Sequence, residues 1–221
     1  MCWSAEVSLI TFITSASMCA YLWYRNEIND RALSLWIFSF ALMQLFEFFM
    51  WINMKNHSFV SKVSLIFILL QPLVLSYALL KYGTIYDEKY VEYLQYAKYL
   101  LWFFIALSAI KVIYTIYYAF IVEANKEWLS VKGPNCHLIW HFIKHQFEMP
   151  YITRINKLYH LPLIIACLLI KPTIPIGIMY SSIGLITYYL SYYFYKLEYG
   201  SIWCWIANIM GLFAIGSKYL I

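Results

Sequence analysis

Apolar residues run through this chain in long stretches, and each stretch ends in a short polar break. A helix that spans a bilayer needs about 20 mostly apolar residues. The runs are continuous and do not alternate apolar with polar residues, so they predict membrane helices and not the strands of a barrel. We expect seven spans, at residues 6–24, 32–53, 60–81, 98–121, 158–171, 174–194 and 201–219.

The fifth of these segments is short and ends at Lys171-Pro172. It could tilt, begin nearer Pro150, or form a helical hairpin with the sixth segment, so six spans with a re-entrant piece is the alternative. Little chain remains for a soluble domain. The predicted fold class is therefore all-α, a polytopic transmembrane helix bundle that makes up one integral membrane domain over residues 1–221.

Seven spans would place the two termini on opposite sides of the membrane. We use "N-terminal face" for the side of the N-terminus, which also receives the loops near 54–59, 122–157 and 195–200; the other side is the opposite face. The loop 122–157 is by far the longest, and long loops are often functional. Within this extramembrane loop, residues 136–145 predict a short interfacial helix, which Pro150 ends.

Composition agrees with a membrane location and narrows the partners. The chain is 63% hydrophobic and 12% charged, and its aromatic content of 21% suits the belts found at membrane interfaces. The net charge of +5 is spread over many loops, with no polybasic run and no glycine-rich phosphate loop. We therefore expect the lipid bilayer, and no nucleic acid, as a partner. Loops of the N-terminal face contain seven Lys or Arg residues, and those of the opposite face contain six. Because cytoplasmic loops are usually richer in Lys and Arg, this small difference favours a cytoplasmic N-terminus.

Polar side chains inside the spans are the first candidate site. Ionisable residues in a bilayer are expensive and usually face the bundle interior or a water-filled cavity. Helix rise puts five such residues in one layer, about 9–16 Å below the N-terminal face. They are Gln44, Glu47, Gln71, Lys111 and Asn208. If their faces converge, they form a one-sided pocket that a small-molecule ligand could enter; alternatively they only hold the bundle together, with Glu47 and Lys111 as a buried ion pair.

Histidines of the long loop are the second candidate. His137, His141 and His145 are four residues apart, so on a helix they form one stripe that could bind a divalent metal. Glu47 or a thiol from the N-terminal face could complete the ligand set. The alternative is an amphipathic face at the membrane surface. None of the five cysteines forms a C-x-x-C pair, which excludes a zinc ribbon or a thioredoxin-like motif.

Four stretches resemble a family of small multi-pass membrane proteins of giant viruses and some bacteria, which begin with Met-Cys-Trp-Ser. They are residues 1–8, Ala41–Glu47, Cys136–Trp140 and Gly200–Trp205. The resemblance would cover nearly the whole chain. It implies a multi-pass helical membrane protein, and it implies no particular activity for this chain. It also draws attention to residues at the N-terminal-face ends of the first and last spans, namely Cys2, Trp3, Ser4, Trp203 and Cys204.

Three kinds of function fit these observations. The first is transport or conduction of a small solute, ion or proton through the polar layer. The second is a membrane-embedded enzyme that acts on a lipid-like substrate, with metal dependence as one version of this hypothesis, although no G-x-S-x-G nucleophile motif is present. The third is a structural viral or host-membrane component without catalysis. A retinal protein is excluded, because Lys218 of the last segment lies too close to the chain end to hold the chromophore.

Overall fold

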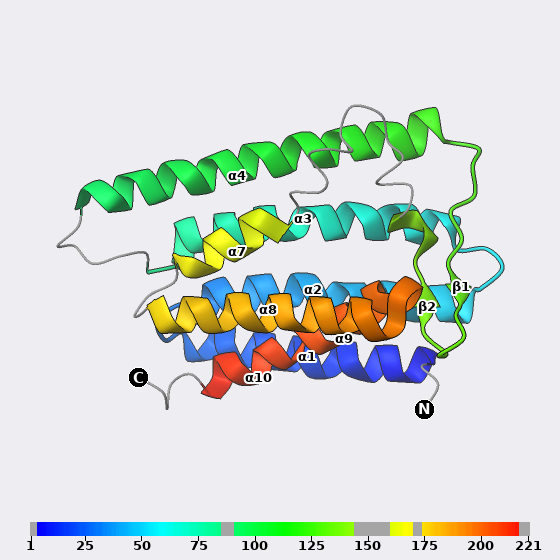
Figure 1. Cartoon of the computed structure of the whole chain (residues 1–221), viewed down its shortest axis with the longest axis horizontal. Coiled ribbons are helices and arrows are strands. Elements are labelled where there is room, and N and C mark those ends of the chain that lie inside the picture. Colours follow the sequence, from blue (N-terminus) through cyan, green and yellow to red (C-terminus); the bar gives the residue numbers. More distant parts are fainter. Residues whose placement is uncertain (1–3, 85–90, 144–159, 170–173, 217–221) are drawn as a thin grey trace.

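The computed structural model describes residues 4–84, 91–143, 160–169 and 174–216. Its N-terminal half is four long helices, each folded back against the one before (Figure 1). The elements are α1 Ala5–Arg25, α2 Asp30–Ile52, α3 Ser58–Tyr82 and α4 Val91–Tyr117, with a π-helical last turn, η2, at Tyr118–Val122. The first three cover the predicted spans to within two residues at each end, and α4 begins seven residues earlier than predicted.

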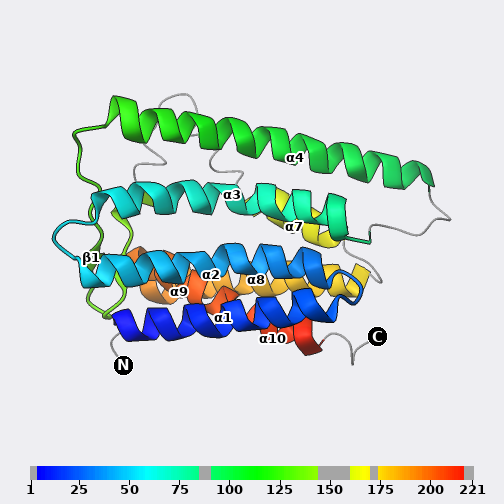
Figure 2. The same cartoon turned by 180° about the vertical axis from the view of Figure 1, so that it is seen from behind.

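The second half packs against the first. It contains α7 His160–Leu168, α8 Ile174–Tyr195, a 3-10 turn η3 Lys196–Glu198, α9 Tyr199–Ala207 and α10 Ile209–Gly216. The chain reverses at η3, where Lys196 has a left-handed φ of 44°, so that α9 lies alongside α8. Seen from behind in Figure 2, α2 lies among α1, α3 and the second-half helices, and many of its side chains are buried.

Five segments of the described chain are long and apolar enough to cross a membrane. Four are α1, α2, α3 and α4 with η2; the fifth runs over α8, α9 and α10 together. The protein is thus a helical bundle compatible with integral membrane insertion. The described residues of α7, His160–Leu168, are not among these five segments. The count of seven spans stays a prediction.

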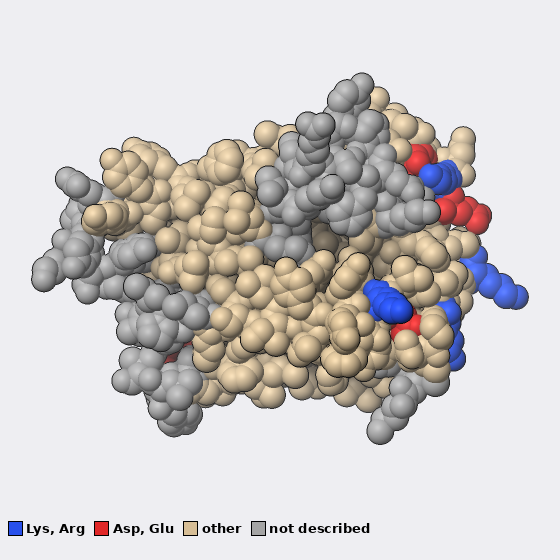
Figure 3. All heavy atoms as spheres, in the orientation of Figure 1, with Lys and Arg blue, Asp and Glu red and all other residues tan. Residues whose placement is uncertain are grey.

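The outside of the bundle is apolar, as a lipid-facing surface requires. On α4, which lies at the edge of the bundle, a continuous series of large side chains is exposed, among them Trp102, Phe103, Ile110 and Ile113. A soluble monomer rarely exposes so large an apolar surface. On the face shown in Figure 3, the visible charged side chains gather at one end of the molecule and leave its middle uncharged.

A short antiparallel hairpin covers that charged end. Its strands are β1 Val131–Lys132 and β2 Leu138–Ile139, and they are the only strands in the part of the chain that the structure describes. The structure therefore differs from the predicted helix over 136–145: residues 136 and 137 lie in the hairpin turn, and helical structure begins at His141. We call this end, which carries the hairpin and the first turn of α1, the hairpin end; it corresponds to the N-terminal face.

Candidate polar site beneath the hairpin

Glu47 is completely buried in the middle of the protein. It lies in α2 with Gln44 one turn before it, and both side chains are 0% exposed. Three side chains face the Glu47 carboxyl: Ser201 of α9, Trp140 after β2, and Gln44 itself. The Cys204 thiol, three residues after Ser201, is also close enough to interact electrostatically with this carboxyl. Residues from three separate parts of the chain thus converge here, and we call Gln44, Glu47, Trp140, Ser201 and Cys204 the Glu47 site.

The polar atoms of the Glu47 site are poorly satisfied. Within the described residues, neither carboxyl oxygen of Glu47 makes a hydrogen bond of normal geometry, and neither do the two polar atoms of the Gln44 amide. The Trp140 indole nitrogen is equally unpaired there. A buried polar group without a partner costs about 1–3 kcal/mol, and more when it is charged. An arrangement of this kind is stable with a proton on the carboxyl, or with water, a cation or a polar solute bound between these groups.

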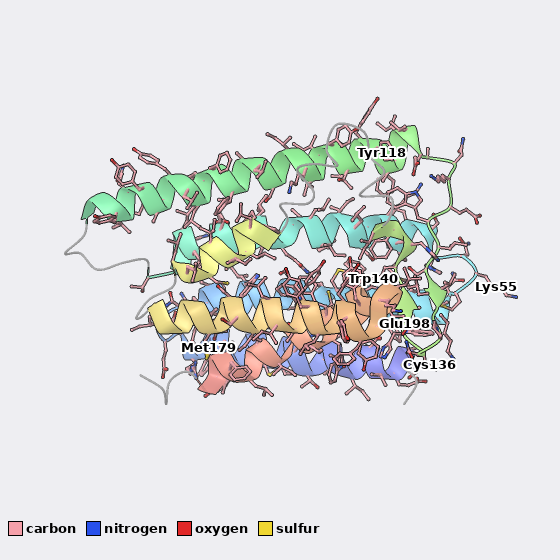
Figure 4. All side chains as sticks on the ribbon, in the orientation of Figure 1. Lys55, Tyr118, Cys136, Trp140, Met179 and Glu198 are labelled. Carbon is pink, nitrogen blue, oxygen red and sulfur yellow. The ribbon has the colours of Figure 1, made fainter. Side chains whose placement is uncertain are left out.

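The hairpin places Trp140 over Glu47. Its turn is closed by a 2.8 Å hydrogen bond from the Gly133 amide to the His137 carbonyl oxygen. Buried Glu198, in η3, accepts a 2.9 Å hydrogen bond from the Asn135 amide through Oε1, which fixes the turn to the end of α8 (Figure 4). The Trp140 ring then stacks on Phe142, with ring centroids 5.4 Å apart.

Two glycines make this close packing possible. A Cβ atom on Gly200 would lie 2.8 Å from Cε3 of Trp140, and one on Gly133 would overlap the Glu198 carboxylate. Both positions therefore need a residue without a side chain. Gly200 belongs to a stretch that the sequence had singled out, and its packing against Trp140 gives that stretch a physical role at the Glu47 site.

A small cavity lies farther from the hairpin than the Glu47 site. Its volume is about 30 Å³, which leaves room for one or two water molecules. It is lined by Trp36 and Phe40 of α2, Cys167 of α7, Tyr180 and Ser181 of α8, and Trp203 of α9. Phe40 lies one turn from Gln44 on α2, so the cavity and the Glu47 site are neighbours along this helix. Its lining is mostly apolar, with the Ser181 hydroxyl among its polar groups.

The other members of the predicted polar layer lie elsewhere. Lys111 is buried in α4, which packs on α3, and the ion pairs of the described residues do not include one between Lys111 and Glu47. Gln71 of α3 donates a 3.4 Å hydrogen bond to the Ser39 carbonyl oxygen of α2, so it links two helices. Equal depth in the membrane did not bring these side chains to the Glu47 site.

Asn208 interrupts the last span. Its Nδ2 donates to the carbonyl oxygen of Cys204 at 2.8 Å and to that of Trp205 at 3.3 Å, and the helix breaks there into α9 and α10. Asn208 also lines a separate open groove, together with Thr14 and Ser15 of α1. It therefore acts on its own helix and does not join the Glu47 site.

The predicted histidine stripe is not one helical face. His137 is buried in the hairpin turn, His141 is exposed at the start of the next helical segment, and His145 lies outside the described residues. Within the residues that are described, no three His, Cys, Asp or Glu side chains are placed to hold a metal ion. Divalent metal binding stays a prediction.

The residues that the resemblance singled out at the ends of the first and last spans do not all lie at one site. Cys2 and Trp3 lie outside the described residues. Ser4 caps α1 by accepting a 3.4 Å hydrogen bond from the Val7 amide, which is a structural role. Trp203 donates from its indole to the Gly184 carbonyl oxygen at 3.3 Å and lines the cavity, whereas Cys204 belongs to the Glu47 site.

Sequence reasoning missed Ser201 and Glu198, although a signal was present. Glu198, Ser201 and Cys204 follow one another at intervals of three residues, the spacing that puts side chains on one face of a helix. Comparison with family models, with curated proteins and with solved structures finds no significant match to this chain. The resemblance to the family that begins with Met-Cys-Trp-Ser therefore stays a prediction.

Proposed function

We propose that this protein conducts protons or carries a small cationic or polar solute, with the Glu47 site as the point where the proton or solute is bound. One observation carries the proposal: Glu47 and Gln44 together bury four hydrogen-bonding atoms that make no hydrogen bond of normal geometry within the described residues, although Ser201 and Trp140 face the carboxyl. Ionisable residues in membrane helices usually serve substrate or ion pathways, because their burial is too expensive to keep without a use.

Three other buried or half-buried polar side chains, on Ser34, Trp205 and Gln71, give a useful contrast, although they are not typical of every buried polar group in the described residues. Ser34 of α2 donates to the Cys19 carbonyl oxygen of α1 at 2.8 Å, and the Trp205 indole donates to the Thr11 hydroxyl at 3.1 Å. With Gln71, these side chains have found partners on neighbouring helices, as expected of residues that hold a bundle together. The Glu47 site differs from them because its hydrogen-bonding capacity is unused, and this difference supports binding over a purely structural role.

The location of the site also favours transfer over catalysis. The Glu47 site lies directly beneath the hairpin, and the cavity between Trp36, Phe40 and Trp203 lies deeper in the bundle. In the proposed pathway, a proton or small ion moves from Glu47 through this cavity toward the opposite face. Ser201 and Cys204 lie beside the Glu47 carboxyl, but we name no reaction for this site.

Flux measurements on reconstituted protein test the proposal. Liposomes containing the full chain are loaded with a pH-sensitive dye, a proton gradient is imposed, and Na⁺ and K⁺ uptake is followed in parallel. Wild-type protein should carry one of these cations faster than protein-free liposomes. Glu47→Gln should reduce that flux to the protein-free level, because the amide has a similar shape but cannot take up or release a proton or pair with a cation.

Glu127→Gln is the matched control, since it makes the same chemical change in an exposed side chain at the hairpin end. It should leave flux unchanged. Size-exclusion chromatography and thermal unfolding of both variants show whether each still folds. The proposal fails if wild-type protein carries none of the three cations, or if a folded Glu47→Gln variant carries them at the wild-type rate.

A further inference from the structure

The cysteines of the described residues are in two different states. Cys19, Cys167 and Cys204 are free and buried in the helices, whereas Cys136, in the hairpin turn, is disulfide-bonded. The chain contains five cysteines. The remaining one is Cys2, which lies outside the described residues.

Cys2 is close in sequence to the end of α1 that lies beside the hairpin. Cys2 precedes Ser4, the N-cap of α1, by two residues, and a fully extended chain of that length spans at most about 7 Å. The first turn of α1 and the hairpin lie at the same end of the bundle (Figures 1 and 2). Cys136 itself is held in a left-handed conformation, with φ 65°, and its amide donates to the Gly133 carbonyl oxygen at 3.1 Å.

We propose that Cys136 is joined to Cys2, and that the hairpin end therefore faces the oxidising, extracytoplasmic side of the membrane. Structural disulfides form and persist in oxidising compartments and are rare in the reducing cytosol. The two thiols form the S–S bond and give up two protons and two electrons to the disulfide of a thiol–disulfide oxidoreductase, which becomes a dithiol. The three free thiols are shielded from this exchange by burial within the bundle.

A second feature at the hairpin end agrees with this orientation. Asn56-His57-Ser58 is the one Asn-x-Ser/Thr triplet in the sequence, and Asn56 is exposed in the loop between α2 and α3. Such triplets accept N-linked sugars on the lumenal or extracellular side. The opposite orientation, to which the count of Lys and Arg leans, rests on a difference of one residue between the two faces. A covalent bond that needs an oxidising compartment outweighs that difference.

Thiol counting tests the disulfide. Membranes containing the full chain are denatured, free thiols are blocked with N-ethylmaleimide, the protein is reduced, and newly exposed thiols are tagged with a polyethylene-glycol maleimide. Wild-type protein should shift on a gel by two tags. The shift should vanish in both Cys136→Ser and Cys2→Ser and persist in the control Cys167→Ser. A wild-type protein that gains no tags, or a Cys2→Ser variant that still gains them, would overturn the pairing.

Orientation is tested separately in intact cells with a membrane-impermeant maleimide. Asn125→Cys places an exposed thiol at the hairpin end, and Ile28→Cys places one in the loop between α1 and α2 at the other end. The first variant should label in intact cells, and the second only after the cells are permeabilised. Labelling of Ile28→Cys in intact cells, or no labelling of Asn125→Cys there, would reverse the proposed orientation. Neither test depends on what the Glu47 site carries.

Discussion

The guanidinium of Arg25 donates two hydrogen bonds of 2.7 Å to the carboxylate of Asp30, one from Nε and one from Nη2. The same guanidinium donates to the Ile215 carbonyl oxygen at 2.9 Å and to that of Ala214 at 3.1 Å. Arg25 thus places a positive charge at the carbonyl end of α10, where helix geometry favours a cation. This one side chain joins α1, α2 and α10 at the end of the bundle away from the hairpin.

Loss of the Asp30 charge should destabilise the fold. Asp30 is 2% exposed, and breaking a buried ion pair leaves the remaining charge uncompensated at a cost of about 3–5 kcal/mol. We expect Asp30→Asn to lower the unfolding temperature in detergent clearly. Glu27→Gln is the control, because Glu27 is half-exposed and lies 3.7 Å from Arg25, a distance at which such pairs contribute about 0–1 kcal/mol. Equal effects of the two substitutions would contradict the structural role given to Asp30.

Gly200→Ala should disturb the packing of Trp140, which lies over Glu47. The added methyl group would meet Trp140 Cε3 at 2.8 Å and Ile143 Cδ1 at 3.1 Å, and overpacking of this kind costs about 1–3 kcal/mol. We expect lower thermal stability and a changed Trp fluorescence spectrum. Gly216→Ala is matched to it, because no atom lies within 4 Å of the new methyl group there. That control should leave stability unchanged or raise it slightly, since Ala is the better helix former.

His137 should make the hairpin less stable in acid. Burial lowers the pKa of His137 below its ordinary value of 6.5, and nearby Glu198 offsets this only in part. The folded state therefore takes up a proton less readily than the unfolded chain, so stability is full above pH 6.5 and falls as pH drops below it. Hydrogen exchange of the hairpin amides should quicken below that pH. His137→Asn should remove this dependence, whereas the exposed control His141→Asn should keep it.

Much of the helical bundle could be predicted from the pattern of apolar residues in the sequence. Runs of about 20 apolar residues can only be helices in a bilayer, so α1, α2 and α3 follow directly from the sequence. The break at Asn208 does not follow, because an Asn in a span can equally bond to another helix. Its actual partners are carbonyl oxygens of its own helix, and that choice depends on the packing around it.

The candidate site was also predictable from the sequence only in part. Gln44 and Glu47 are three residues apart, so their shared face and depth could be predicted from α2 alone. Depth does not fix how a helix is rotated or where it stands in the bundle, and for that reason Lys111 could not be excluded in advance. The contribution of Trp140 depends on a hairpin whose turn is held by Glu198, and that contact joins residues 63 positions apart in the chain.

Replacing Gln44 should show whether this residue serves binding at the Glu47 site or only the stability of the fold. Both polar atoms of Gln44 are buried without a partner in the described chain, so Gln44→Leu removes unpaired groups and should raise stability, by up to about 1–3 kcal/mol. The same substitution should impair flux through the Glu47 site, because the leucine cannot assist a proton or cation there.

Gln71→Leu is the matched control. It removes a hydrogen bond to the Ser39 carbonyl oxygen and should lower stability by about 0.5–1.5 kcal/mol. Thermal unfolding and liposome flux measured on both variants decide between the two roles, since a Gln44→Leu protein that is destabilised but still fully active would identify Gln44 as a packing residue.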